Sequence, residues 1–308
     1  MTAMTVLGEI ALDELGTTQM HEHILADSDF SGSDRNVVLD EVDVAVDEIR
    51  HFRRAGGHTI VEQSCMGLGR DVLGLKKISE ATGVNIIAST GFYRECSYPD
   101  FVRHETADQL AARMVRECTA GIDDTGIKPG ILAEIATEYG VGRMSPLEEK
   151  VFTAVAYAQT ETHLPVSTHC WAGELAFEQI DVLTRNGVPP EKIIIGHLAV
   201  DGRVKDRIYA IANRGVCLGV DAIGYEYGKV VVLKDRGKAE FTKELIDKGY
   251  LKQITVSQDL LRKLLLKHYH GIGYDYLLLQ FVPMLLEAGV AQHEIETIFI
   301  QNPKRIFS

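Results

Sequence analysis

The sequence predicts a (β/α)8 TIM barrel. Three observations predict it: short apolar, β-branched runs alternate with longer segments of helical period, the alternation repeats eight times, and ionisable residues stand at the ends of several runs. The eight candidate strands are residues 17–23, 58–65, 84–91, 130–137, 165–170, 192–198, 216–222 and 253–259. A doubly wound open sheet would also alternate in this way. The polar residues at the strand ends favour the barrel, because barrel enzymes place their chemistry there.

The segment between the first two strands has the pattern of a helix. Apolar residues recur in it at three- and four-residue steps, at Leu39, Val42, Val46, Ile49 and Phe52. These steps place them on one stripe that covers the barrel wall. Gly56 and Gly57 then end the helix.

The segment after the fourth strand carries a complete helix start. Ser145 is an N-cap, a proline occupies the first helical position, and Glu148 completes a capping box. The apolar face that follows consists of Val151, Val155 and Ala158. Two later segments, 276–287 and 292–300, are expected to supply closing helices.

Composition bounds the class of protein. A chain of 308 residues suits one barrel, which needs about 250 residues plus loops, and no linker divides it, so we expect a single domain over residues 1–308. The net charge of -12 is spread along the chain, which argues against nucleic acid or an anionic membrane as a partner. The first 15 residues lack a signal-peptide pattern and no apolar run reaches about 18 residues, so we expect a cytoplasmic protein.

A histidine pair ends the first candidate strand. Side chains alternate along a strand, so His21 and His23 point to one face while Glu22 points to the other. An H-x-H pair alone is weak evidence for a metal site. Four more ionisable residues stand in the same context, namely Glu134, His169, His197 and Asp259. Each one alone has the alternative of an interior hydrogen-bonded histidine or a helix-capping acid, but together they indicate a site at the strand ends.

The six candidate ligands are too many for one tetrahedral zinc. Divided between two ions, with one carboxylate shared, they give each ion about three protein ligands and leave room for a bridging hydroxide. This is the arrangement of two-metal hydrolysis. We therefore expect two divalent metal ions, zinc first, with manganese or cobalt as alternatives.

The five cysteines predict no further site. They are odd in number and form no C-x-x-C pair, so neither a disulfide framework nor a zinc knuckle is indicated. Cys170 follows a candidate ligand, but alternation turns it away, and we interpret it as a small buried thiol.

Beyond the six candidate ligands, the chain carries an ordered set of motifs, namely Met20-His21-Glu22-His23, Thr90-Gly91-Phe92-Tyr93, Glu134-Ile135-Ala136-Thr137, Thr168-His169, Ile195-Gly196-His197, Ser257-Gln258-Asp259 with Arg262, Gly273-Tyr274-Asp275-Tyr276-Leu277 and Asn302-Pro303. This set resembles the phosphotriesterase-related family of the amidohydrolase superfamily, in its glutamate-bridged, phosphotriesterase homology type. The motifs cover essentially the whole chain in order.

The resemblance implies a role for each ligand. His21, His23 and Asp259 correspond to the family's ligands of the buried metal, and His169 and His197 to those of the exposed metal. Glu134 stands where other members have a bridging carboxylated lysine. Asp259 is the expected catalytic residue, which accepts the proton of the attacking hydroxide and passes it to the leaving group. A homodimer is usual in the family.

Three positions depart from the family pattern. Some members have an aspartate shortly after the strand-six histidine, where this chain has Ala199 and Val200, and Asp201 is the candidate substitute. A strand-seven histidine that removes a proton in other members is missing, with Asp221-Ala222-Ile223 in its place. The route by which a proton leaves is therefore open.

Four residues are candidate substrate contacts, namely Tyr93, Trp171, Lys229 and Arg262. In phosphosugar-lactone-cleaving relatives an arginine at the place of Arg262 binds the anionic end of the substrate, a task that its planar fork suits. The alternative for Arg262 is a salt bridge to the barrel rim, and for Lys229 a surface position.

We expect a metal-dependent hydrolase, of amidohydrolase type, that attacks an ester or lactone of a small, anionic metabolite. The alternatives in the same class are an N-acyl amino acid or acyl-amine amidohydrolase and a phosphoester or phosphotriester hydrolase. A non-catalytic ligand-binding barrel is the alternative from a different class.

Overall fold

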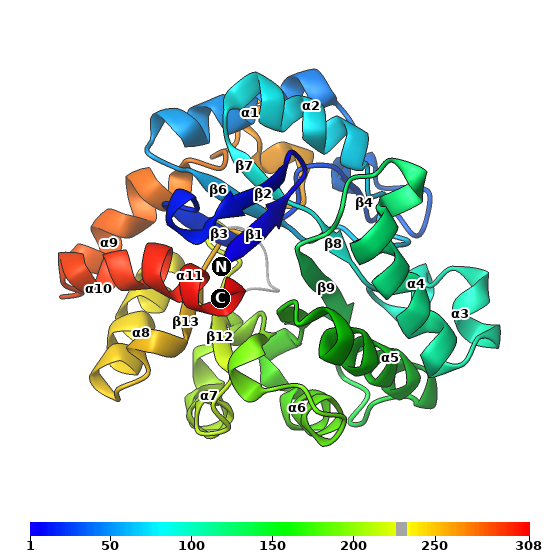
Figure 1. The fold of residues 1–308 in the computed structure, drawn as a ribbon. Coiled ribbons are helices and arrows are strands. Elements are labelled where there is room, and N and C mark those ends of the chain that lie inside the picture. Colours follow the sequence, from blue (N-terminus) through cyan, green and yellow to red (C-terminus); the bar gives the residue numbers. More distant parts are fainter. Residues whose placement is uncertain (226–232) are drawn as a thin grey trace.

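Eight parallel strands form a ring at the centre of the computed structural model, which describes residues 1–225 and 233–308 (Figure 1). They are β3 (Thr18–Glu22), β6 (Thr59–Glu62), β7 (Asn85–Ile87) with its continuation β8 (Ser89–Thr90), β9 (Ile131–Ala136), β10 (Val166–His169), β11 (Ile193–Ile195), β12 (Cys217–Val220) and β13 (Ile254–Val256). Neighbours pair in the orders β3-β6-β7 and β8-β9-β10-β11-β12-β13. Each strand lies inside a run that the sequence predicts, and the predicted barrel is confirmed.

Side chains complete the ring between β13 and β3. Ser257 Oγ, just after β13, accepts hydrogen bonds from Met20 N and His21 N of β3, each at 2.8 Å. Asp259 N donates to His21 O at 3.1 Å. Over the described residues these bonds stand in place of a ladder between the two strands, so their relative position depends on side chains.

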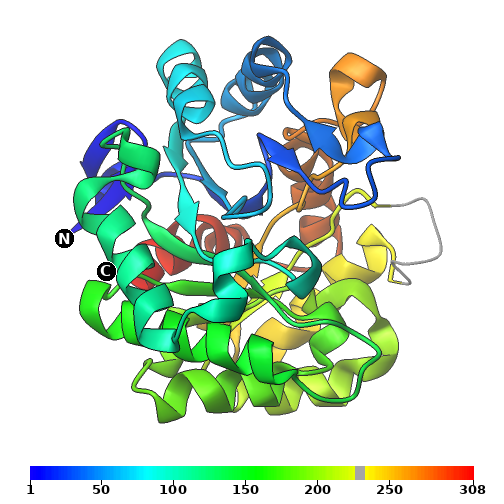
Figure 2. The same cartoon turned by 90° about the vertical axis from the view of Figure 1, so that its right-hand side faces the viewer.

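Helices cover the outside of the ring, as the two perpendicular views show (Figures 1 and 2). They are α1 (Val42–Arg54), α2 (Val72–Thr82), α3 (Asp100–His104), α4 (Ala107–Ala120), α5 (Pro146–Thr162), α6 (Ala176–Arg185), α7 (Lys205–Ala212), α8 (Asp235–Asp247), α9 (Val282–Glu287), α10 (Gln292–Glu296) and α11 (Asn302–Phe307). π-helical turns at Leu277–Phe281 and Thr297–Gln301 extend the closing helices.

Two predicted helix starts have different outcomes. Ser145 caps α5 as predicted, since its hydroxyl accepts from Glu148 N at 3.1 Å and the Glu148 carboxylate accepts from Ser145 N at 2.6 Å. The placement of Leu39 in the first helix is wrong, because Leu39 lies in β5 (Val38–Leu39), which pairs antiparallel with β4 (Ala26–Asp27). Leu39 packs in the same hydrophobic cluster as Ile49 and Phe52 of α1, and its spacing from them in the sequence matches the helical period by chance.

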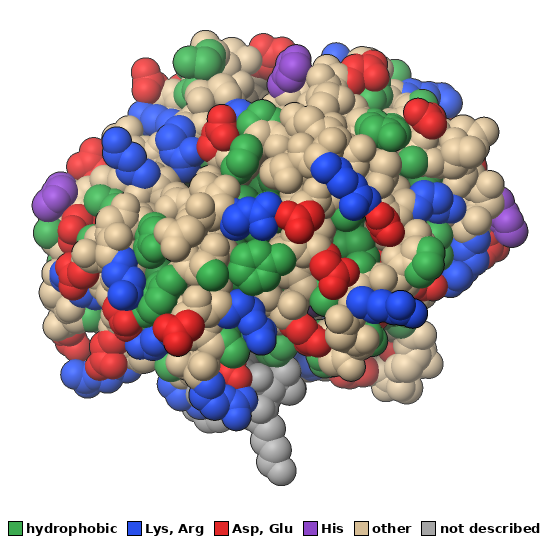
Figure 3. All heavy atoms as spheres, turned by 90° about the horizontal axis from the view of Figure 1, so that it is seen from below, with side chains coloured by type: hydrophobic (Ala, Val, Ile, Leu, Met, Phe, Trp, Pro, Cys, Tyr) green, Lys and Arg blue, Asp and Glu red, His purple; other side chains and the backbone are tan. Residues whose placement is uncertain are grey.

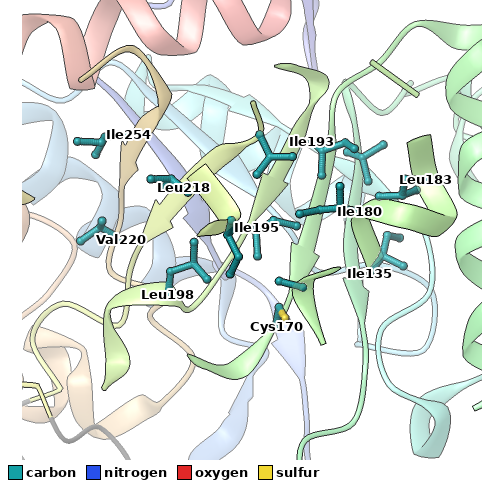
Figure 4. Close-up of a cluster of buried hydrophobic side chains, with 14 of the residues drawn as sticks. Ile135, Cys170, Ile180, Leu183, Ile193, Ile195, Leu198, Leu218, Val220 and Ile254 are labelled. Carbon is teal, nitrogen blue, oxygen red and sulfur yellow. The ribbon is translucent and has the colours of Figure 1, made fainter. Parts of the chain in front are cut away.

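Alternation along the strands builds two apolar layers. Ile193 and Ile195 of β11 point outward into the cluster between ring and helices, together with Leu218 and Val220 of β12 (Figure 4). Ile194 points inward and packs in the barrel interior. The inner cluster also contains Met20, Val61, Ile87, Ile131, Ala133 and Cys217. It fills the lower barrel, which leaves the polar residues of the strand ends on top of an apolar floor.

The N-terminal end of the barrel is closed. A hairpin of β1 (Thr2–Thr5) and β2 (Gly8–Ala11) lies over it, and Leu15, Ile306 and Phe307 join the inner cluster from below. Both chain termini lie at this end (Figures 1 and 2). The C-terminal ends of the strands therefore open at the opposite end.

Charged side chains of both signs lie on the surface (Figure 3). Acidic and basic side chains are intermixed over the face on which α6, α7 and α8 lie (Figure 3). In the described part of the chain, no helix has both the length and the apolar character that crossing a membrane requires.

Candidate metal centre

The barrel mouth brings all six candidate ligands together. β3 supplies His21 and is followed by His23, and the other ligands come from the C-terminal halves or ends of their strands, namely Glu134 of β9, His169 of β10, His197 after β11 and Asp259 after β13. Five of the side chains are buried, and Asp259, at 18% exposure, is the most open of the six. The site thus stands at the end of the barrel that is open.

The backbone turns sharply at the ends of three successive strands. His197, Ala222 and Asp259 have φ values of 58°, 55° and 55°, in the left-handed region that non-glycine residues seldom adopt. Such conformations persist where surrounding structure holds them, and they cluster at functional sites. Here they direct the His197 and Asp259 side chains toward the centre of the mouth.

Glu134 lies at the centre of the histidines. Its Oε1 atom is 3.0 Å from His169 Nδ1, 3.0 Å from His197 Nε2 and 3.3 Å from His21 Nε2. Its Oε2 atom lies 3.7 Å from His23 Nε2. One carboxylate therefore faces all four imidazoles.

Asp259 faces the same centre from the other side. Its Oδ1 atom is 3.3 Å from His23 Nε2 and 3.6 Å from His21 Nε2. Its Oδ2 atom lies 3.7 Å from His197 Nδ1. Glu134 thus lies near all four histidines, and Asp259 lies near three of them, His21, His23 and His197.

The electrostatics of the cluster calls for positive charge. Burial alone would lower the pKa of His21, but Glu134 and Asp259 outweigh it and raise that pKa to about 9. Burial opposes ionisation of Glu134 as well, yet His21 and His169 hold the pKa of this carboxyl well below its ordinary value. The negative charge of these carboxylates, which favours protonated imidazoles, would equally favour a bound cation.

The donor set fits a pair of divalent cations. Three groups of three ligand atoms lie within 4.8 Å of one another: His21, His197 and Asp259; His21, His23 and Glu134; and Glu134, His169 and His197. Glu134, His21 and His197 each belong to two of these groups, and Glu134 is the only carboxylate among the three. His21 Nε2 is buried without a hydrogen-bond partner in the described structure and faces this centre. Imidazole nitrogen and carboxylate oxygen are the ligands that zinc and similar ions accept.

Asp221 orients His197, a role that the sequence did not reveal. Its Oδ1 atom accepts from His197 Nδ1 at 2.8 Å and its Oδ2 atom accepts from His197 N at 2.8 Å. A proton on Nδ1 leaves the lone pair of Nε2 directed at Glu134 and the centre. Although burial favours the neutral acid, His197 holds the pKa of Asp221 below its ordinary value.

A second hydrogen-bonded chain orients His23. Ser64 Oγ lies 3.0 Å from His23 Nδ1 and donates to Glu62 Oε1 at 2.5 Å. Because the hydroxyl gives its proton to Glu62, it accepts one from His23 Nδ1, which leaves His23 Nε2 to face the centre. Glu62 and Ser64 end the second barrel strand, and only their position at a strand end signalled a role.

Two other residues lie apart from the cluster. Asp201, the candidate substitute in the loop after β11, instead forms an ion pair with Arg203 and accepts from Arg203 N at 2.9 Å. Cys170 packs among Ile135, Ile195 and Leu198 in the outer apolar layer (Figure 4). Burial raises the pKa of its thiol to about 12, as the interpretation of a small buried thiol requires.

Aromatic rings flank His169 and His197. Tyr93 packs edge-on against His169, with ring centroids 5.2 Å apart, and Trp171 packs at 5.8 Å from His197. Phe30 lies 6.4 Å from Tyr93 and Tyr139 lies 6.3 Å from Trp171, which extends each wall outward. The two walls enclose the side of the mouth where His169 and His197 meet.

The candidate cations differ in how far the structure describes them. Arg262 has a side chain that is 49% exposed, and its Nη1 atom lies 3.7 Å from the exposed Asp34. This pair joins the loop after β13 to the loop after β3. The salt bridge to the barrel rim, which was the alternative for Arg262, is therefore present, at the long distance of 3.7 Å. Lys229 lies outside the described residues.

A family model described as the phosphotriesterase family matches residues 1–307. The phosphotriesterase homology protein of Escherichia coli is 33% identical over 300 residues, which cover 97% of this chain and 100% of the relative. Its crystal structure, with phosphate in the active site, matches with a TM-score of 0.91 at 31% identity over 96% of this chain and 100% of that chain.

Two further relatives have names that state an activity. An N-acetyltaurine hydrolase of Dictyostelium discoideum is 34% identical over 282 residues, which cover 89% of this chain and 75% of the relative. The crystal structure of a lactonase from Listeria monocytogenes matches with a TM-score of 0.91 at 29% identity, over 100% of this chain and 99% of that chain.

Proposed function

This chain belongs to the phosphotriesterase family, whose members are binuclear metal hydrolases, and on that premise we propose that it cleaves a small, anionic ester or lactone with the help of two divalent metal ions. The observation that supports the proposal most is the convergence of four imidazoles and two carboxylates on one buried centre at the barrel mouth. A protein that only binds a small organic ligand does not require six metal-ligating side chains at one place.

Each ligand has a place in the proposed centre. His21, His23 and Asp259 would hold one ion, His169 and His197 the other, and Glu134 would bind both. When bound, such ions supply Lewis acidity, which lowers the pKa of a water molecule and polarises the oxygen of the substrate's reacting group. A glutamate at the bridge carries its own carboxylate and needs no reaction with carbon dioxide.

Asp259 is the proposed proton carrier. Its Oδ1 atom faces His21 and His23, whereas its Oδ2 atom lies farther from the histidines and belongs to the most exposed of the six side chains. Oδ2 would accept the proton of the attacking water and pass it to the leaving group. This route needs no histidine in the Asp221-Ala222-Ile223 stretch after β12.

The mouth suits a substrate with an apolar part and an anionic end. The two aromatic walls, whose innermost rings are Tyr93 and Trp171, would enclose the acyl part of the substrate beside His169 and His197. Arg262 can leave its loose, exposed pair with Asp34 at small cost and bind a carboxylate or phosphate instead. Lys229 stays a candidate contact on sequence grounds alone.

Lactones are our first choice and N-acyl amines the second. The lactonase of Listeria monocytogenes matches over the full length of both chains and supports the first. The N-acetyltaurine hydrolase of Dictyostelium discoideum has the higher identity and supports the second. The same metal centre serves both reactions, because each adds water to an acyl group.

A substrate screen of the reconstituted protein tests the proposal. Protein loaded with zinc or manganese would be offered lactones, N-acyl amino acids and phosphotriesters, each with and without an anionic substituent. We expect metal-dependent turnover of anionic lactones above all others. Turnover of N-acyl amines alone would favour the second choice, and two bound ions without turnover in any class would support a ligand-binding barrel.

A further inference from the structure

Glu22 is a buried carboxylate that does not face the metal centre. It stands between His21 and His23, and alternation along β3 turns its side chain to the other side of the strand. The residue is 0% exposed, and in the described structure no lysine or arginine forms an ion pair with it. A buried carboxylate without a cation requires strong hydrogen bonds to offset its lost hydration.

Those hydrogen bonds come from the backbone on both sides of Asp259. Glu22 Oε1 accepts from Gln258 N at 2.7 Å, and Glu22 Oε2 accepts from Leu260 N at 3.0 Å. The amide between them, Asp259 N, donates to His21 O at 3.1 Å. Three successive amides after β13 are thus held by two successive residues of β3.

The same backbone is strained and is fixed from a second direction. Asp259 has a φ of 55°, so its left-handed conformation needs outside support. Tyr225 Oη donates to Asp259 O at 2.6 Å and accepts from Leu261 N at 3.2 Å. The polar backbone atoms around Asp259 are therefore bound on both faces, and small rotations of its peptide planes would break these bonds.

The contact is also reciprocal across the seam of the barrel. Ser257 Oγ accepts from the β3 backbone at Met20 and His21, and the Glu22 carboxylate accepts from the backbone after β13. These side chains stand where other neighbouring strands have a ladder. The distance between His21 and His23 on one strand and Asp259 on the other thus depends on them.

We propose that Glu22 is a positioning residue, which holds the Asp259 carboxylate on the metal centre by clamping the backbone amides on either side of it. The inference rests on the proposed function, because it takes Asp259 as a metal ligand. Glu22 would thus support the metal centre indirectly, by fixing Asp259, and would not itself be a metal ligand.

Metal retention of Glu22→Gln tests the proposal. A glutamine of the same shape keeps one acceptor but turns an NH2 group toward the other amide, so Asp259 loses its fixed geometry. We expect about 10- to 100-fold weaker binding of one ion, as for other residues that orient metal ligands. Chelator competition followed by elemental analysis should show the loss pattern of Asp259→Asn and not that of His169→Ala.

Glu148→Gln is the matched control. Glu148 is equally buried, at 1% exposure, and also accepts from two backbone amides, Glu138 N and Ser145 N, each at 2.6 Å. Both variants should lose thermal stability, but Glu148→Gln should keep both ions at wild-type affinity. Equal metal retention in Glu22→Gln and Glu148→Gln would overturn the proposal and leave Glu22 a structural role only.

Two further results keep the outcomes distinct. If Glu22→Gln does not fold, Glu22→Asp decides, because its shorter side chain keeps both carboxyl oxygens but cannot span both amides; full metal affinity in that variant overturns the proposal. Wild-type protein that binds fewer than two ions would instead contradict the proposed function, whatever the variants do.

Discussion

Replacing Asp221 by asparagine is expected to weaken the metal centre without entering it. Asp221 is not among the six candidate ligands, yet it accepts from both the ring and the backbone of His197, each at 2.8 Å. Asparagine has the same shape but only one acceptor oxygen. In Asp221→Asn the NH2 group must therefore face one of the two His197 donors.

The size of the effect follows from these contacts. Asp221 is buried at 1% exposure, so solvent does not replace the lost bond. A hydrogen bond to a buried charged group contributes about 1.5–3 kcal/mol. Since about 1.4 kcal/mol corresponds to a factor of ten, one lost bond predicts about 10- to 150-fold weaker binding of the ion that His197 holds.

Competition with a chelator of known affinity measures this effect. Asp201→Asn is the control, because Asp201 lies in the loop after β11, as His197 does, but pairs with Arg203 outside the cluster, and the metal affinity of this variant should not change. Asp221→Asn should release one ion early and keep the other. Metal affinities within twofold of wild type in Asp221→Asn would refute the reasoning that Asp221 sets the orientation of His197.

Three other variants test separate parts of the account. Glu134→Gln should strongly weaken binding of both ions because an amide brings no negative charge. Reconstitution of the wild type with metal should not depend on bicarbonate, and a gain in activity with bicarbonate would instead indicate a carboxylated lysine. Arg262→Met should lower kcat/KM by up to about fivefold for anionic lactones, because its half-exposed side chain makes a partly screened contact, whereas equal losses for neutral lactones would remove its role in selection. Ile195→Ala should cost about 2–5 kcal/mol in the free energy of unfolding, measured with denaturant, because Ile195 is fully buried in the outer layer; its metal content should stay at the wild-type level, and a loss of ions would show that the outer layer also shapes the centre.

The barrel could be predicted because several of its strands are apolar, β-branched runs that are buried on both sides, and the others repeat at the same spacing. Ile193-Ile194-Ile195 is such a run, with side chains buried on both sides of the strand. Two pairs of short strands could not be predicted, namely the hairpin of β1 and β2 and the ribbon of β4 and β5. These strands have two to four residues each, and they are partly exposed or show no clear alternation of apolar and polar residues. Leu39 shows the difficulty, because an apolar residue next to a helix fits the helical period by chance.

The candidate ligands could be identified because their type and position both stand out. A histidine or acid at the end of an apolar run, as at His197 or Asp259, is conspicuous in the sequence alone. The residues that orient them are not conspicuous, since their role lies in contacts between distant parts of the chain. Glu22 reaches the amide of Gln258, 236 residues away, and no local pattern predicts that contact.

Metal stoichiometry tests the central claim most directly. Purified protein, saturated with zinc or manganese and freed of loosely bound ions, would be analysed for metal per chain, alongside His169→Ala. The account predicts about two ions per wild-type chain and about one in the variant, with hydrolysis rising as the second ion binds. One ion or none in the saturated wild-type protein would contradict it.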